Sequence, residues 1–293
     1  MMNRRDFHKL SFGAAVMPFL GGVEAAVAAP APKNTFSVML WTIDNKISFV
    51  QKLEMVAAAG YTSVEVGNEY EKWTPEEWKT NQAALKRLKL GVDSAVPGRN
   101  ALADHTKRTA LHDDLVKAIP GAKELGCKQF IYTAFNRVPT QTPAEQRAAI
   151  VDTLKYAADV LEKDQMEIVL EPIDLLEHKE EAVVSVSEAF AICREVNSPR
   201  IKVLYDFYHE QRQAGNLIEK LDGNIDLVGL VHVADVPGRH EPGTGEMYWP
   251  NIYKKLAELK YTGVICMEFK PVGDWVKTLT KAREEAVTAL QDA

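Results

Sequence analysis

The chain has 293 residues, of which 46% are hydrophobic and 26% are charged. This is the composition of a globular protein with enough apolar residues for one large α/β domain or two smaller ones. The formal net charge of -6 argues against nucleic acid as a partner, because an acidic surface repels a phosphate backbone.

Residues 1–29 have the three parts of an export signal. Arg4 and Arg5 precede the apolar stretch LSFGAAVMPFLGG, and the small residues of AAVAA come after it. This pattern resembles a twin-arginine signal, which is removed on export. We therefore expect an exported, periplasmic protein whose folded domain comprises residues 33–293. No membrane span is expected in the mature chain, since no later run approaches the ~20 apolar residues that a span needs.

The mature chain alternates between short apolar runs and segments with apolar residues at helical spacing. The runs predict eight strands, at residues 36–41, 62–66, 90–96, 129–134, 167–172, 201–206, 227–235 and 263–269. Continuous apolar runs indicate strands that are buried on both faces, and eight strand–helix units predict a single (β/α)8 TIM barrel. A doubly wound open sheet is the alternative. However, WTIDNK follows the first strand where a nucleotide-binding sheet would have a Gly-rich fingerprint.

Potential metal ligands follow or end the last four predicted strands. The fifth run ends with Glu171, the sixth ends with Asp206, the seventh contains His232 and the eighth contains Glu268. Taken singly, each acid could be a helix cap and the histidine a core residue. In a barrel, however, strand ends meet at one mouth, and buried like charges are costly without a cation among them. The four residues together therefore predict a metal site.

Four segments carry a resemblance to a known family. VLEPID, YDFYHEQRQAGNL, HVADVPGRHEPGTGEMYW and CMEFKP resemble the sugar isomerase and epimerase family with a xylose isomerase-like barrel, most closely its hydroxypyruvate isomerase-like branch. The resemblance covers essentially the whole mature chain. One position departs from that branch, because hydroxypyruvate isomerases usually have Gln where this chain has His232, and ketose 3-epimerases of the family have His.

The resemblance implies roles for seven residues. The implied metal ligands are Glu171, Asp206, His232 and Glu268, and the implied acid–base pair is Glu171 with Glu268. The implied substrate contacts are Glu177, His209 and Arg239. The residues themselves leave other readings open, since Glu177 could be a charge at a helix start and the other two could brace the loop. Either Arg239 or His240 could neutralise a polar ligand, or His240 could be a solvated loop residue.

The implied chemistry is proton transfer through an enediolate. Oxygen ligands with one imidazole suit Mn²⁺ or Mg²⁺, although Co²⁺, Zn²⁺ or Fe²⁺ could use the same site. A Lewis acid bound to an α-hydroxy ketone or aldehyde acidifies the neighbouring C–H group, and the glutamates then move the proton. Return of the proton to the adjacent carbon gives isomerisation, and return to the opposite face gives epimerisation. The expected partner is a small carbohydrate or hydroxy-keto compound.

Three other functions stay open at this stage. The same metal and glutamates could serve a lyase that acts on 3-keto glycosides, or the protein could be a non-catalytic periplasmic sugar-binding protein. An endonuclease of this barrel type needs a histidine-rich zinc cluster, and the chain has only 7 histidines. A homo-oligomer is one option for its assembly. Glu65 and the turn at 96–99 also follow strands, but they are left outside the catalytic set.

Overall fold

The structure is a computed structural model that describes residues 32–98 and 102–292. Eight parallel strands pair in chain order and close into a barrel, with β8 hydrogen-bonded to β1. The predicted TIM barrel is therefore confirmed. The predicted export signal at residues 1–29 lies outside the described residues. The strands are β1 (Thr35–Met39), β2 (Ser63–Val66), β3 (Gly91–Ala95), β4 (Gln129–Thr133), β5 (Glu167–Glu171), β6 (Ile201–Asp206), β7 (Val228–Val233) and β8 (Val264–Met267).

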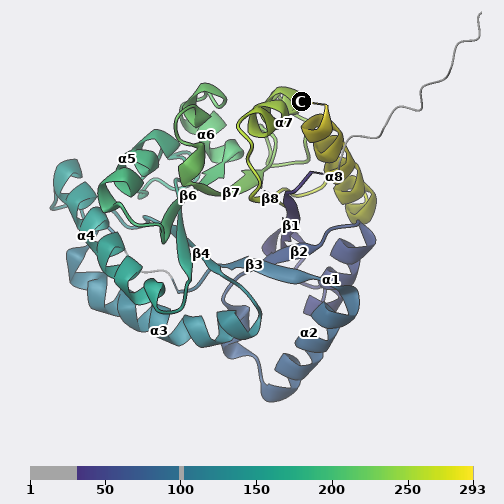
Figure 1. Cartoon of the computed structure of the whole chain (residues 1–293), viewed down its shortest axis with the longest axis horizontal. Helices are drawn as coiled ribbons and strands as arrows, with labels where there is room; N and C mark the ends of the chain where they lie inside the picture. The colour runs from purple at the N-terminus through teal and green to yellow at the C-terminus, as the bar shows by residue number, and fades with distance from the viewer. Residues whose placement is uncertain (1–31, 99–101, 293) are drawn as a thin grey trace, which may run out of the picture. The chain divides into compact units, whose positions relative to one another are not determined.

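Helices surround the strands and cover the outer face of the barrel (Figure 1). All eight strands lie where the sequence predicts them, with ends that differ by no more than two residues. The long predicted strand at 227–235 is shorter than expected because its last residues already turn into the loop above the barrel. The helices are α1 (Phe49–Ala58), α2 (Pro75–Leu88), α3 (Arg108–Glu124), α4 (Pro143–Glu162), α5 (Val186–Val196), α6 (Phe207–Gln213), α7 (Trp249–Glu258) and α8 (Trp275–Gln291).

Local sequence explains where several helices begin. Three of them start at a capping box, in which a Ser or Thr hydroxyl and a Gln or Glu side chain satisfy each other's backbone N–H groups. In two of the three, Pro occupies the first turn, where its missing N–H costs nothing. The capping pairs are Ser48 with Gln51 for α1, Thr74 with Glu77 for α2, and Thr142 with Glu145 for α4.

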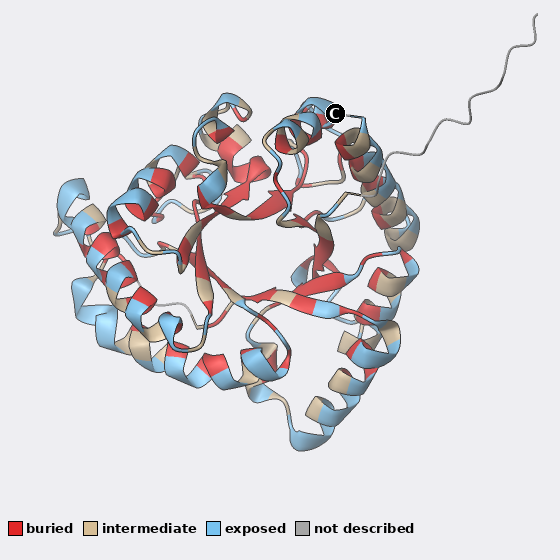
Figure 2. Ribbon diagram, in the orientation of Figure 1, coloured by how far each residue is buried: buried red, intermediate tan, exposed pale blue. Residues whose placement is uncertain are grey.

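Both faces of the strands are buried, as Figure 2 shows by the red colour of the barrel wall. The outer face packs against the helices in a large apolar cluster. The inner face holds a second, smaller apolar cluster, formed by Met39, Ile131, Val169, Leu204, Leu230 and Cys266. This two-sided burial explains why the strands read as continuous apolar runs.

One side of the barrel interior is polar. Ser37 of β1 and Ser63 of β2 both donate hydrogen bonds to Oδ1 of Asp93, and the Ser37 bond is 2.7 Å long. The pairing of β2 with β3 skips Asp93, because Val64 lies opposite Val92 and Glu65 lies opposite Ser94. This β-bulge turns the Asp93 side chain toward the serines of the barrel interior.

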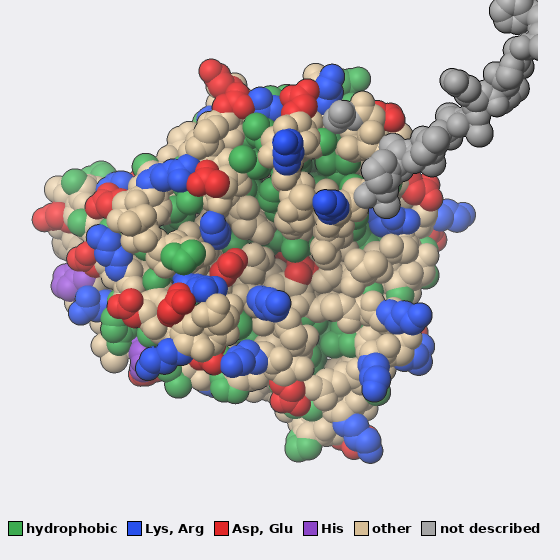
Figure 3. Space-filling view, in the orientation of Figure 1, with side chains coloured by type: hydrophobic (Ala, Val, Ile, Leu, Met, Phe, Trp, Pro, Cys, Tyr) green, Lys and Arg blue, Asp and Glu red, His purple; other side chains and the backbone are tan. Residues whose placement is uncertain are grey.

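Charged side chains of both signs are interspersed over the face of the molecule in Figure 3. In the described part of the chain, no helix is both long and apolar enough to cross a membrane.

Candidate active site

Four side chains of ligand type converge at the carboxyl ends of the last four strands. Glu171 ends β5, Asp206 ends β6, His232 is the penultimate residue of β7 and Glu268 follows β8. One donor atom from each lies within 4.8 Å of the others, and all four side chains are buried. Strand register contributes to this convergence, because Asp206 lies opposite His232. The structure thus brings together the four residues that were predicted to hold a metal.

Asp206 belongs both to the cluster and to a helix. Its Oδ1 atom accepts hydrogen bonds from the backbone N–H groups of Tyr208, at 2.8 Å, and His209, at 3.4 Å, and so caps α6. Its Oδ2 atom faces the other way and lies 3.2 Å from Arg239. Asp206 can therefore cap the helix and bind a metal at the same time, because the two roles use different oxygens.

The two glutamates of the cluster have different electrostatic surroundings. Burial and the charge of Glu268 raise the pKa of Glu171. Burial also acts on Glu268, but Arg239 and His232 outweigh it and hold the pKa of Glu268 below its usual range. The contacts agree with this difference, since Nδ1 of His232 lies 2.7 Å from Glu268 but 3.8 Å from Glu171.

Arg239 brings a positive charge to the acidic cluster. Its guanidinium lies 2.5 Å from Oε2 of Glu268 and 3.0 Å from Nε2 of His209. It also lies above the rings of Trp41 and Tyr208, with its central carbon 5.5 and 4.8 Å from the two ring centres. Such stacking holds the guanidinium plane in place while leaving its N–H groups free to donate.

The three residues predicted to contact substrate lie together beside the cluster. His209 is buried and Nδ1 of its ring is 2.7 Å from Asp174, which leaves Nε2 facing the site. Glu177 lies at the rim, where it is 3.3 Å from Arg239 and 3.0 Å from Arg212. This placement fits the predicted roles of the three residues as substrate contacts.

The loop after β7 is organised by one buried acid. Asp235 is fully buried and accepts hydrogen bonds from the backbone N–H groups of Val236, Gly243 and Met247. Gly245 fits because it lacks a side chain, since a Cβ there would lie 2.0 Å from the carbonyl oxygen of Val236. The glycines and prolines of this segment thus serve a compact loop that presents Arg239 to the cavity.

His240 does not take part in the cluster. Its Nδ1 atom is 2.8 Å from the carbonyl oxygen of Lys270, and the N–H group of Lys270 donates to the carbonyl of Arg239. Of the two loop residues that could have neutralised a ligand, only Arg239 faces the site. His240 instead helps to fasten the loop to the segment after β8.

The cluster forms one end of a cavity of about 460 Å³. This volume lies within the usual range for small-molecule sites, which is roughly 300–1,000 Å³. Apolar residues also line the cavity and come from the segments that follow β1, β3, β4 and β5, with Trp41, Val96, Phe135 and Ile173 among them. Trp41 also donates a hydrogen bond of 2.8 Å from Nε1 to Glu268.

Sequence reasoning missed three residues that shape this site: Trp41, Asp174 and Glu65. The first two lie in the loops after β1 and β5, where no periodicity indicates which side chain turns inward. The segment VLEPID gives a weak signal for Asp174. This acid lies three residues after Glu171, which ends β5, and can therefore reach the same end of the barrel. Glu65 was noted as a strand-end acid but was not connected to His232.

The residues of the cluster fit a divalent cation. Three carboxylates and one imidazole offer hard oxygen donors and one nitrogen, which suits Mn²⁺, Mg²⁺ and similar ions better than metals that prefer thiolate. Burying three acids so close together is costly unless positive charge lies among them. The donor set and its burial therefore agree with the expected metal site, and they leave the identity of the metal open.

Known proteins with similar sequences are isomerases. A sequence model of the xylose isomerase-like TIM barrel family matches residues 53–290. Hydroxypyruvate isomerase of Escherichia coli (strain K12) is 29% identical over 243 residues, which cover 80% of this chain and 93% of that protein. A putative hydroxypyruvate isomerase of Homo sapiens is 29% identical over 273 residues, which cover 86% of this chain and 95% of that protein.

Solved structures share the fold at lower identity. A family 2 AP endonuclease from Brucella melitensis superposes with a TM-score of 0.78 and 23% identity, over 86% of this chain and 98% of that one. D-Allulose 3-epimerase from Methylomonas sp., in complex with D-allulose, gives a TM-score of 0.72 and 21% identity, over 88% of this chain and 97% of that one. At these identities the likeness establishes the barrel alone.

A buried acid beside the site predicts a pH dependence of stability. Glu181 is fully buried, and its Oε2 atom has no hydrogen-bond partner among the described residues. Burial, together with the charge of Glu171, raises the pKa of Glu181 from 4.5 to about 8. The folded state therefore favours the neutral acid, and the stability that this residue contributes falls as the pH rises from 4.5 to about 8.

The variant Glu181→Gln mimics the neutral acid at every pH. We expect its melting temperature to exceed that of the wild type by an amount that grows between about pH 5 and pH 8 and then levels off. Thermal melts in the presence of a chelator measure this difference without a contribution from bound metal. Parallel melting curves over this range would contradict the assignment, and Glu195→Gln on the exposed surface is the matched control.

Proposed function

Because this chain belongs to the xylose isomerase-like TIM barrel family, we propose that it is a divalent-metal-dependent isomerase or epimerase of a small sugar or hydroxy-keto acid. One observation carries the proposal: two buried glutamates lie beside a histidine and an aspartate, with donor atoms of all four within 4.8 Å. The names of the relatives, hydroxypyruvate isomerase and D-allulose 3-epimerase, support the same type of reaction. A binding protein would have no need for two such acids.

The metal of the proposal is Mn²⁺ or Mg²⁺, held by Glu171, Asp206, His232 and Glu268. When bound, it supplies Lewis acidity, which acidifies the C–H group next to a coordinated carbonyl and stabilises the enediolate. The protein keeps the ligands in place through strand register and through the cap that Asp206 makes to α6. Arg239 donates hydrogen bonds to substrate oxygens, and His209 lies beside it with Nε2 on the same side of the cavity.

The glutamates of the quartet move the proton. One of them removes the proton from the carbon next to the carbonyl, and the same or the other glutamate returns one. Return to the neighbouring carbon converts an aldehyde or ketone into its isomer, and return to the opposite face inverts the carbon. Apolar residues that line the cavity, such as Phe135 and Ile173, reduce the access of water to the reacting carbon.

A lyase that acts on 3-keto glycosides is the second candidate. An enediolate next to a glycosidic carbon can expel the aglycone, with the same base and the same metal. The cavity volume of about 460 Å³ favours this candidate, because a three-carbon acid alone would not fill it. Trp41 is exposed and can pack against a second group of the substrate, such as the aglycone. Release of an aglycone distinguishes it from isomerisation.

Removal of a ligand should abolish the stabilisation by metal. We expect added Mn²⁺ to raise the melting temperature of the wild type, since 100-fold excess over the dissociation constant is worth about 2.7 kcal/mol. Asp206→Ala and His232→Ala should show little or no such rise. The comparison with and without Mn²⁺ isolates binding, because loss of the Asp206 cap by itself costs about 1 kcal/mol. An undiminished rise in both variants would refute the site, and exposed Asp226→Ala serves as the control.

The proton-transfer step can be tested with heavy water. Glu171→Gln and Glu268→Gln keep side-chain size but remove basicity, so each should slow deuterium uptake into the substrate by about 10²- to 10⁴-fold. The assay follows candidate keto sugars and hydroxypyruvate by NMR and records which carbon is labelled. Label at the adjacent carbon indicates isomerisation, and label with inversion indicates epimerisation. Exchange rates unchanged from the wild type in both variants would refute the assignment of these glutamates as the acid–base groups, and a wild type without any exchange would leave a binding protein as the better description.

The export proposal concerns residues that the structure does not describe. We propose that residues 1–29 direct the folded protein through the twin-arginine route to the periplasm. Changing Arg4 and Arg5 to Lys should leave the precursor in the cytoplasm with its activity intact. Fractionation of cells that express the two forms measures this, and normal export of the double variant would speak for a different route.

A further inference from the structure

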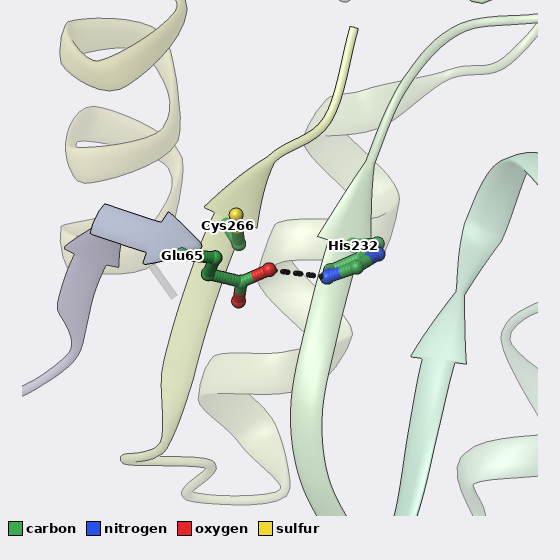
Figure 4. A group of neighbouring side chains, drawn as sticks. All are labelled: Glu65, His232 and Cys266. Carbon is green, nitrogen blue, oxygen red and sulfur yellow. Dashed lines mark hydrogen bonds and ion pairs between the residues drawn. The ribbon is translucent and has the colours of Figure 1, made fainter. Parts of the chain in front are cut away.

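Glu65 lies below the metal cluster, inside the barrel, and none of the proposed steps uses it. It belongs to β2 and is fully buried, with a relative exposure of 0%. Its side chain reaches toward β7, where its Oε2 atom is 2.9 Å from Nε2 of His232 (Figure 4). A buried carboxylate that contacts a candidate ligand is placed to influence that ligand.

The two ring nitrogens of His232 face different surroundings. Nε2 faces Glu65 in the interior, whereas Nδ1 faces the cluster, 2.7 Å from Glu268. A histidine binds metal through a nitrogen that carries no hydrogen, and the other nitrogen then carries it. Glu65 accepts a hydrogen bond at Nε2, so the hydrogen remains there and Nδ1 is left for the metal.

We propose that Glu65 is a positioning residue, which fixes the ring of His232 with Nε2–H toward the barrel interior and Nδ1 toward the metal. This inference rests on the proposed metal-dependent function. It assigns Glu65 no contact with substrate or with the ion. A carboxylate behind a metal-bound histidine both orients the ring and increases its strength as a ligand, and loss of such a partner commonly weakens metal binding 10- to 100-fold.

The neighbouring acid, Asp93, supplies the matched control. It lies in the same polar layer and accepts hydrogen bonds from Ser37 and Ser63, but it does not contact His232. Burial and the charge of Glu65 raise the pKa of Asp93 well above its usual range. Asp93→Asn changes one acid of the barrel interior and leaves the contact between Glu65 and His232 in place.

The alternative to a positioning role is that Glu65, His232 and Cys266 bind a second cation. One donor atom from each of these side chains lies within 4.8 Å of the others. Such a site would require His232 to bind metal through both nitrogens and to give up its last N–H hydrogen. It would also require the thiolate of Cys266, whose pKa is raised well above its usual value by burial and by the charges of nearby acids such as Glu65. Positioning by Glu65 needs neither change.

The experiment compares Glu65→Gln with Asp93→Asn and the wild type. A glutamine fills the same space, but it can donate as well as accept, so it no longer determines which nitrogen carries the hydrogen. We expect the dissociation constant for Mn²⁺, measured by chelator competition, to rise about 10- to 100-fold in Glu65→Gln. It should stay within about twofold of wild type in Asp93→Asn, since a carboxylate tunes a metal-binding histidine only through direct contact with its ring.

A second measurement observes the histidine ring of the wild type directly. In Zn²⁺-loaded protein labelled with ¹⁵N-histidine, couplings between ring protons and nitrogens should show Nδ1 of His232 bound to metal and Nε2 carrying hydrogen. His232→Gln identifies the signals. In Glu65→Gln the Nε2–H signal should be lost or should exchange rapidly with solvent.

Three results would overturn the inference. They are metal bound at Nε2, two ions per chain, or unchanged Mn²⁺ affinity in Glu65→Gln. The last of these, found together with a metal-dependent wild type, would refute the role of Glu65 and leave the proposed function intact. A wild type that binds no divalent ion would overturn both.

Discussion

The energetic cost of placing three carboxylates together in a poorly solvated barrel mouth governs the structure around the site. Glu171, Asp206 and Glu268 arrive there because parallel strands end at one edge. Two of the three are offset by positive groups: Asp206 by the N-terminus of α6, and Glu268 by Arg239 and His232. The loop after β7 holds Arg239 at the cluster. A divalent ion would complete this balance.

Sequence reasoning succeeded where a simple geometric rule connects sequence to space. Strands that are buried on both faces read as apolar runs, and residues at their carboxyl ends must meet, so Glu171 and Asp206 could be placed without coordinates. The family resemblance, rather than geometry, supplied His209, which the structure places one helical turn from Asp206.

The same reasoning failed where the outcome depends on contacts between distant segments. Which ring nitrogen of His232 faces outward is decided by Glu65, a residue 167 positions away in the chain. The bulge at Asp93 interrupts the alternation of inward and outward residues, which a strict period of two cannot anticipate. Trp41 and His240 lie in loops whose direction is set by hydrogen bonds to Glu268 and Lys270 rather than by local propensity.

Charge and shape in this cavity come from different parts of the barrel. The segments after β5 to β8 supply the charged residues, whereas those after β1, β3 and β4 supply much of the apolar wall. In the loop after β7, a Cβ at Gly245 would lie 2.0 Å from the carbonyl oxygen of Val236, so that loop tolerates almost no variation. The two parts of the ring therefore differ in what a substitution would change. A change at Phe135 would reshape the cavity without touching the charged cluster.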